Sequence, residues 1–400
     1  MKATPVKSLL SALCAVFVLV SCGGGPSTGG GIGGTGIISS GTVSAYGSIF
    51  VNGLEFDTSD AVIVANGVEV GMGDEFVLEY LDIGKMVLVE GTGDMDASQA
   101  VADRVTYRDN VAGPVQSIVD IDPTTREIVV LGQRVILNVL TKFKGSDFDI
   151  STIKVDDLVA VSGLVDDNDD IRATFIEKTG EFMPGNIVGV TGFVDNLDED
   201  AQIFQINSLT VGYSGIAQVD LPEDFAENLL VEVEGTLDVA GGIMTATSIE
   251  SGDEIDDADQ IEVLGFVTNV YSVVDPIEFS IGNQVVQLEA NAEFVDGNAA
   301  NIVLGAKLEA EGYLQGGTLF ADEIEFWGPD QIEVEGWVTD VASDSEFTLD
   351  DKHVVQTDAG TVFEPGDLVI EAGMMIEVKG VPVDMAYSVI VADKVSLEED

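Results

Sequence analysis

The chain has 400 residues, with 72 acidic and 16 basic side chains and a formal net charge of −56 at pH 7. This charge argues against nucleic-acid binding, which depends on Lys and Arg to neutralise phosphates, and anionic lipid headgroups are repelled likewise. Cations, cationic polymers and neutral sugars remain compatible partners. Hydrophobic residues make up 46% of the chain, in short alternating runs, so the composition predicts folded cores despite the acidity.

Residues 1–21 have the pattern of a secretory signal peptide. Lys2 and Lys7 give a basic start, and residues 9–20 form an apolar run without a charge. This run is shorter than the roughly 20 residues that a helix needs to cross a bilayer, so it fits the middle of a signal peptide better. Cleavage would remove two lysines and no acidic residue, and would make the mature chain still more acidic.

The segment Leu19-Val20-Ser21-Cys22 resembles the lipobox of bacterial lipoproteins. That resemblance implies cleavage before Cys22 and lipid attachment to Cys22, where two acyl chains suffice for stable anchoring. Gly23 lacks the Asp that tends, in that class, to retain lipoproteins in the inner membrane, so the outer membrane is the expected location. Exposure to the periplasm or to the cell surface stays open. The alternative is an ordinary signal peptide in which Cys22 is incidental.

Residues 22–36 form a Gly-rich segment that we expect to act as a flexible tether. Gly31, Gly33 and Gly36 have the spacing of a dinucleotide-binding fingerprint, but no strand pattern precedes them and no helix pattern follows. We therefore interpret them as low-complexity sequence. Cys14 lies in the signal peptide, so a mature chain with a lipidated Cys22 would have no thiol for disulfides, redox chemistry or zinc.

After the tether the chain repeats itself five times. Each copy has a Gly in its first strand pattern, a Gly at the end of a later strand pattern, and a closing Ala-x-x-Ile or Ala-x-x-Val. The first glycines are Gly41, Gly113, Gly192, Gly265 and Gly336, and the later ones are Gly91, Gly163, Gly235, Gly312 and Gly380. The expected repeats are 37–108, 111–178, 187–251, 261–327 and 332–398.

The repeat predicts an all-β fold of five tandem, OB-like small barrels. Apolar and charged residues alternate in the strand patterns, and Asn52-Gly53 is typical of a type I′ hairpin turn. Glycines inside strands mark the bends or bulges at which a small barrel turns its corners. A two-sheet sandwich is the alternative. We expect the modules to follow one another as beads in a row.

Together with the lipobox and the Val51-Asn52-Gly53 hairpin, these repeated positions resemble an uncharacterised family of bacterial lipoproteins with tandem β-barrel domains of unknown function. The resemblance implies a fold and a membrane anchor, and it brings no catalytic residue. Copy two departs from it with Leu131-Gly132 in the turn, and copy three with Asn207-Ser208.

Few residues are candidates for chemistry. His353 is the sole histidine, so a Ser-His-Asp site would have to use it; we expect it on the solvent face of a strand. Trp327 and Trp337 flank the junction of copies four and five, where they could stack on a sugar, and packing of that junction is the preferred interpretation. No catalytic residue, metal ligand or cofactor is predicted.

Acidic loops are the remaining candidates for cation binding. Asp166, Asn168 and Asp170 have EF-hand spacing, but Ile171 stands where that loop needs Gly, and the following residues form a closing strand. We expect a solvated hairpin tip there, with a shallow Ca²⁺ site as the alternative. The same interpretation applies to residues 195–200 and 253–259.

The leading functional hypothesis is a non-enzymatic, lipid-anchored envelope protein that presents barrel modules for structural, adhesive or ligand-binding roles. One alternative is a carbohydrate-binding or Ca²⁺-responsive accessory module. A hydrolase with an Asp/Glu pair is another, although 72 acidic residues place carboxylates near one another by chance. The sequence does not identify a protein partner.

Overall fold

The structure is a computed structural model that describes residues 36–46, 49–95, 99–238, 242–252, 257–343, 345–384 and 387–397. The expected signal peptide, Cys22 and residues 22–35 of the expected tether lie outside the described residues. Gly36, expected as the end of the tether, is the first residue of a strand. In the part of the chain that the structure describes, no helix combines the length and the apolar character needed to cross a membrane.

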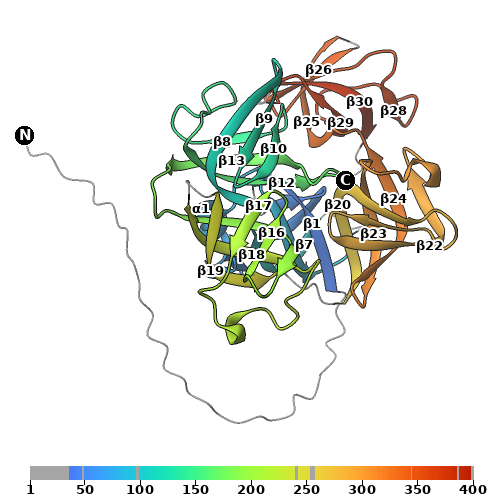
Figure 1. The fold of residues 1–400 in the computed structure, drawn as a ribbon. Coiled ribbons are helices and arrows are strands. Elements are labelled where there is room, and N and C mark those ends of the chain that lie inside the picture. Colours follow the sequence, from blue (N-terminus) through green and yellow to red (C-terminus); the bar gives the residue numbers. More distant parts are fainter. Residues whose placement is uncertain are drawn as a thin grey trace, which may run out of the picture. The chain divides into compact units, whose positions relative to one another are not determined.

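Strands make up most of the described chain (Figure 1) and fall into five successive groups, here called barrels 1 to 5. Barrel 1 contains β1 (Gly36–Tyr46), β2 (Ile49–Val51), β3 (Leu54–Asp57), β4 (Val62–Ala65), β5 (Val68–Met72), α1 (Asp74–Tyr80), β6 (Met86–Thr92) and β7 (Gln99–Tyr107). Barrel 2 contains β8 (Val111–Asp122), β9 (Thr125–Val130), β10 (Gln133–Leu137), β11 (Lys142–Lys144), β12 (Asp157–Val165) and β13 (Ile171–Glu181).

Barrels 3 to 5 follow the same plan. Barrel 3 contains β14 (Ile187–Phe193), β15 (Asp195–Asp198), β16 (Ile203–Ile206), β17 (Leu209–Gly212), the 3-10 helix η1 (Gln218–Asp220), β18 (Leu230–Asp238) and β19 (Ile243–Ser251). Barrel 4 contains β20 (Ala258–Ser272), β21 (Glu278–Ile281), β22 (Gln284–Val295), the 3-10 helix η2 (Ala299–Asn301), β23 (Lys307–Gln315) and β24 (Thr318–Trp327). Barrel 5 contains β25 (Ile332–Ser343), β26 (Glu346–Leu349), β27 (His353–Gln356), β28 (Val362–Glu364), β29 (Met375–Pro382) and β30 (Val389–Leu397).

Barrel 4 shows how each sheet closes. β20 pairs with β21, β21 with β22, β22 with β24 in parallel, β24 with β23, and β23 again with β20. Five strands thus form a closed ring, and β23 and β24 lie side by side in Figure 1. The other barrels repeat the parallel pairing of a hairpin strand with the last strand of the copy. The tandem-barrel prediction is confirmed, and the sandwich alternative is wrong.

The hairpin turns follow the sequence in two different ways. Asn52 and Gly53 have φ angles of +49° and +80°, which are those of the expected type I′ turn. Leu131 and Gly132 take φ angles of +47° and +75°, so copy two keeps the same left-handed geometry without an Asn. Leu131 is fully buried, and burial of its side chain offsets part of the backbone strain of a non-glycine residue there.

The later glycine of each copy lies at a β-bulge, as the sequence predicts. In barrel 4 the register of β23 and β24 shifts between Glu311 and Gly312, and a Cβ on Gly312 would lie 1.9 Å from the backbone oxygen of Phe320. Only glycine fits such an approach. The shift recurs at the corresponding glycine of every barrel, namely Gly91, Gly163, Gly235 and Gly380.

The first-strand glycine has a different role from the expected bend. A Cβ on Gly41 would overlap the Asn52 side chain, and one on Gly336 would lie 2.6 Å from a carboxylate oxygen of Asp350. These glycines make room for the hairpin that folds over them. The bend itself comes a few residues later, for example between Val43 and Ala45, where β1 changes its partner from β6 to β2.

The barrels are not beads in a row. β1 of barrel 1 pairs in parallel with β20 of barrel 4, so the two barrels share one sheet. In the same way β8 of barrel 2 pairs with β14 of barrel 3 in antiparallel orientation. The interiors of barrels 2 and 3 belong to one continuous hydrophobic cluster, whereas barrel 5 has a cluster of its own. The expectation of separate beads was wrong because the alternating pattern was taken to place outward strand faces in solvent. Neighbouring barrels cover part of these faces instead.

The sequence analysis also missed α1 in barrel 1. This helix has seven residues and buries Val77, with Leu81 buried directly after it. Two buried positions four residues apart are too few to form a recognisable helical period.

Candidate functional site

Five glutamates gather where barrels 1, 4 and 5 meet, and we call them the acidic junction. They come from β20, β23, β24 and β25, and they are Glu262, Glu309, Glu311, Glu325 and Glu333. Strand alternation explains the arrangement. Ile261 and Leu308 point into barrel 4, so Glu262 and Glu309 must point outward from it. The outward face is then covered by a neighbouring barrel, and both carboxyl groups are buried.

The Glu262 and Glu309 carboxyl groups form the centre of the junction. One carboxylate oxygen from each of Glu262, Glu309 and Glu311 lies within 4.8 Å of the other two. Glu262 and Glu309 are 4% and 8% exposed, so their two carboxyl groups lie close together away from water. From barrel 1, the Ser39 hydroxyl donates to Glu262 over 3.3 Å. Burial raises the pKa of Glu262, and burial with the nearby Glu262 charge raises the pKa of Glu309 well above its ordinary value.

Two lysines lie at the rim of the junction. Lys379 of β29 forms ion pairs with Glu325 and, over 3.2 Å, with Glu333. Burial opposes the charge of Lys379, but these two carboxylates outweigh it and raise the lysine pKa. Lys307 donates to the Gln331 carbonyl over 2.9 Å, and burial lowers its pKa to about 8. The ion pairs of Lys379 are thus with Glu325 and Glu333, whereas the charge of Lys307 is attracted by Asp330 and by Glu309.

The three clustered carboxylates have the oxygen chemistry that hard divalent cations prefer. Two carboxyl groups that are buried this close together repel each other when both are charged, so a proton shared between them would reduce the charge of the pair without a metal.

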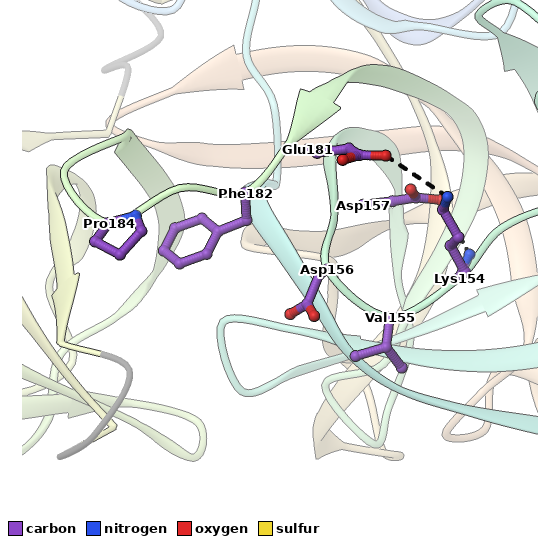
Figure 2. Close-up of a pocket in the computed structure, with 7 residues that line it drawn as sticks. All are labelled: Lys154, Val155, Asp156, Asp157, Glu181, Phe182 and Pro184. Atoms are coloured by element: carbon purple, nitrogen blue, oxygen red, sulfur yellow. Dashed lines mark hydrogen bonds and ion pairs between the residues drawn. The ribbon is translucent and has the colours of Figure 1, made fainter.

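A cavity of about 600 Å³ lies at one end of barrel 2 (Figure 2). Val155, Phe182 and Pro184 form its apolar wall. Two ion pairs lie at its border. Lys154 faces Glu181 at 3.6 Å, and Asp157 accepts from Lys178 over 2.5 Å. The cavity therefore has an apolar wall, with two ion pairs and the Asp156 carboxylate at its border.

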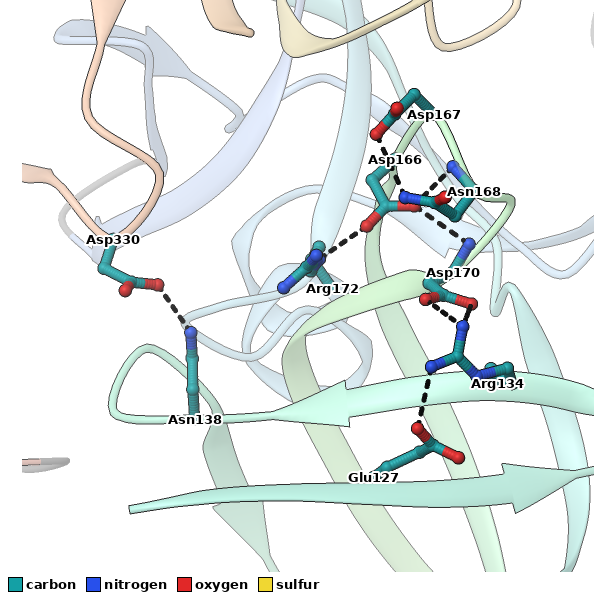
Figure 3. Close-up of polar contacts among 9 residues, drawn as sticks. All are labelled: Glu127, Arg134, Asn138, Asp166, Asp167, Asn168, Asp170, Arg172 and Asp330. Carbon is teal, nitrogen blue, oxygen red and sulfur yellow. Dashed lines mark hydrogen bonds and ion pairs between the residues drawn. The ribbon is translucent and has the colours of Figure 1, made fainter. Parts of the chain in front are cut away.

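The solvated tip expected at residues 166–170 is present only in its middle, where residues 167–169 are exposed, whereas the residues at its two ends are buried. Asp166 is 2% exposed and accepts from the Arg172 guanidinium over 2.7 Å (Figure 3). Its other oxygen accepts from the backbone N–H groups of Asn168 and Asp170. Asp170 is also buried, and Arg134 donates to both of its carboxylate oxygens.

These arginines change the chemistry of the loop. The carboxylates that match EF-hand spacing are already neutralised by arginine, so the loop is a structural ion-pair network. Glu177, which would be the twelfth residue of an EF-hand loop that begins at Asp166, lies in β13 and faces Lys144 at 3.5 Å. The predicted closing strand is confirmed. Of the other acidic segments, Asp195, Asn196 and residues 198–200 are exposed, and residues 253–256 lie outside the described residues.

His353 was also placed wrongly. Its side chain is buried, and its Nδ1 lies 2.6 Å from the carbonyl oxygen of Tyr387, which means that Nδ1 carries the proton. Burial and the cations of Lys352 and Lys142 lower its pKa. The segment that contains Tyr387 covers a strand position that alternation assigned to solvent.

The two tryptophans have different environments. Trp327 lies beneath the ammonium groups of Lys379 and Lys307, 4.4 Å and 5.2 Å from its ring, so it packs between barrels 4 and 5 as expected. Trp337 is 47% exposed and does not have the expected packing role.

The acidic junction is the feature that the sequence analysis missed. Alternation correctly assigned these glutamates to outward faces. It carries no signal for the barrel that covers them, because the covering residues, such as Ser39, lie more than two hundred positions away in the chain.

Comparison with known proteins identifies the repeated unit. The sequence model of a family described as "Domain of unknown function (DUF5666)" matches residues 112–177, 183–250, 253–325 and 335–396, which is more than half of the chain. Barrel 1 lies outside the matched residues. No curated protein matches the chain. A solved structure titled "drosophila Unr CSD456" covers 52% of this chain and 96% of its own, with 16% identity and a TM-score of 0.13, which is too low to support an argument.

Proposed function

The chain belongs to the DUF5666 family, a domain of unknown function that is repeated in tandem here, and on that premise we propose that it is a lipid-anchored, non-enzymatic protein of the bacterial outer membrane. Its barrels would serve as structural, adhesive or ligand-binding modules in the cell envelope. The family supplies the tandem domains, and the anchor and the location are our proposal.

One observation carries the proposal: Cys22 follows Leu19-Val20-Ser21 at the end of a short apolar run with a basic start. A run of this length fits a cleaved signal better than a membrane span. Two acyl chains on Cys22 would bury enough methylene groups for stable attachment, at about 0.8 kcal/mol each.

The proposal that the protein is not an enzyme rests on the contacts made by its potentially reactive side chains. The sole histidine is 7% exposed, and its Nδ1 donates to the backbone carbonyl of Tyr387 where a catalytic triad would have a carboxylate. Asp166 and Asp170 are held by arginines. The barrel interiors are filled by apolar side chains such as Val338, Phe347 and Leu349. These features favour a scaffold over a catalyst.

The experiment that tests the location is fractionation of cells that express the chain with its native N-terminus, compared with a Cys22→Ala variant. We expect the unchanged chain in the outer-membrane fraction, resistant to extraction with high salt. The variant should lose the membrane attachment. Equal distribution of the two chains among the fractions would contradict the proposal.

A further inference from the structure

Barrels 1 and 4 are joined by a short parallel ladder that runs beside the Glu262–Glu309 pair. The ladder pairs Ile37 with Gln260, Ile38 with Ile261, Ser39 with Glu262 and Ser40 with Val263. Glu262 is therefore a ladder residue itself, and its carboxylate accepts from the hydroxyl of its ladder partner Ser39. Any movement of this carboxylate changes the contact between the two barrels.

The pair cannot keep two negative charges in this position. Both side chains are at least nine-tenths buried, and a carboxylate oxygen of one lies within 4.8 Å of a carboxylate oxygen of the other. Two carboxylates in contact and away from water repel each other strongly, which is why such pairs hold a proton between them.

The charged groups around the pair do not replace that proton. Glu311 on β23, Glu325 on β24 and Glu333 on β25 add negative charge. Lys379 on β29 forms ion pairs with Glu325 and Glu333. Lys307 on β23 donates to the Gln331 carbonyl, and its single charge is attracted by Asp330 as well as by Glu309. The polar groups from barrel 1 are the neutral side chains of Ser39 and Asn52.

We propose that the Glu262–Glu309 pair is a proton-dependent latch between barrels 1 and 4. While the two carboxyl groups share one proton, Glu262 stays in the ladder and β1 remains paired with β20. Loss of the proton separates the two carboxylates and opens the ladder, while each barrel stays closed by its own strands. This goes beyond the proposed function, because it concerns how two modules are held together.

The direction of the pH dependence follows from the proton count. In the closed state the pair binds one proton. In the open state the two separated carboxyl groups would release it above their ordinary pKa, near 4.5. Closure is therefore fully favoured below that pH and is lost as the pH rises through the raised pKa of the pair. The opening equilibrium should grow by up to about tenfold per pH unit within this window. Deprotonation of Lys307 begins near its pKa of about 8, so the test stays below pH 7.5.

The test is hydrogen exchange of the backbone amides of residues 37–40 and 260–263 in the full chain, at several pH values from 5 to 7.5. Protection factors remove the intrinsic pH dependence of exchange. We expect the amides that bond between β1 and β20 to lose protection as the pH rises. The other amides of these segments, which bond to β6 or β23, and those of Leu308 and Ala310 inside barrel 4 should keep theirs. In a Glu309→Gln variant, whose amide still donates to Glu262, protection should be high and independent of pH.

Asp322→Asn is the matched control. It makes the same change from a carboxyl group to an amide at an exposed position on β24, so it should behave as the unchanged chain does. The series is run in 0.5 M salt, which screens surface repulsion much more than a buried pair. Constant protection in the unchanged chain, or the same fall in Glu309→Gln, would overturn the latch. Recovery of protection at pH 7.5 on adding Ca²⁺, reversed by chelator, would overturn it too, because a cation would then be the neutralising group.

Discussion

Gly235 of β18 lies opposite Ala246 of β19, at the point where the ladder of these two strands shifts its register. Thr247 is the extra residue of this bulge. The same pairing of a glycine with a buried alanine occurs in the other four barrels, as Gly91 with Ala102, Gly163 with Ala173, Gly312 with Ala321 and Gly380 with Ala392. Two of the three positions that define the sequence repeat are thus one structural unit, the bulge that lets each barrel close.

A methyl group at Gly235 should destabilise barrel 3. Its Cβ would lie 2.1 Å from the Thr245 carbonyl oxygen, so the two strands would have to separate. We expect Gly235→Ala to lower the free energy of unfolding by about 2–4 kcal/mol, measured by urea denaturation. Gly215→Ala is the control, because nothing lies within 4 Å of that position, and it should change stability by less than about 0.5 kcal/mol. Equal effects would contradict the bulge account.

The Asp166 network should contribute to stability without calcium. Asp166→Ala would leave the Arg172 guanidinium and two backbone N–H groups without their acceptor. We expect a loss of about 1–3 kcal/mol, at the lower end of what a broken buried pair costs because Arg172 is 44% exposed.

The unchanged chain should show the same thermal melting curve with Ca²⁺ and with chelator at constant ionic strength. Asp167→Asn serves as the control for the Asp166 variant, since its exposed carboxylate does not accept from an arginine in this network. A Ca²⁺-dependent rise in the melting temperature that disappears in Asp166→Ala would show that this loop binds the cation.

His353 should titrate below its ordinary pKa of 6.5, because it is buried and lies near two lysines. A group whose pKa is depressed on folding contributes stability that is complete above the unfolded value and is lost as the pH falls below it. Barrel 5 should therefore weaken below about pH 6.5, opposite in sign to the effect of Glu309. The sole histidine gives one set of ring signals in NMR, and a midpoint at or above 6.5 would contradict its buried position.

The tryptophans should differ in fluorescence. Trp327 packs beneath two lysines, whereas Trp337 is 47% exposed. In Trp337→Phe, the remaining Trp327 emission should be blue-shifted and resist quenching by acrylamide. In Trp327→Phe, the remaining emission should be red-shifted and easily quenched. Equal quenching in both variants would show that barrels 4 and 5 do not pack in this way.

The internal structure of each barrel can be predicted well from the sequence. Alternation identifies the inward faces, Asn52-Gly53 identifies a turn, and the repeated Gly and Ala identify the bulge. Each of these signals is local, because the residues that interact lie within one copy.

Contacts between barrels cannot be predicted in this way. Alternation separates inward from outward residues, but it does not say which outward residues a second barrel covers. Glu262 and Glu309 are outward residues that became buried for this reason. Asp166 is buried with its charge paired to Arg172 from the same hairpin. His353 is buried because the segment that contains Tyr387, 34 residues further along the chain, covers it.

The most direct test of the proposed function is the chemical state of Cys22. Cells that express the chain with its native N-terminus are grown with labelled palmitate, and the N-terminal peptide of the purified product is analysed by mass spectrometry. We predict that the label is incorporated and that the chain begins at an acylated Cys22, with residues 1–21 removed; Cys22→Ala should abolish the label. An unlabelled product, or one that begins at a free Cys22 or elsewhere, would contradict the account.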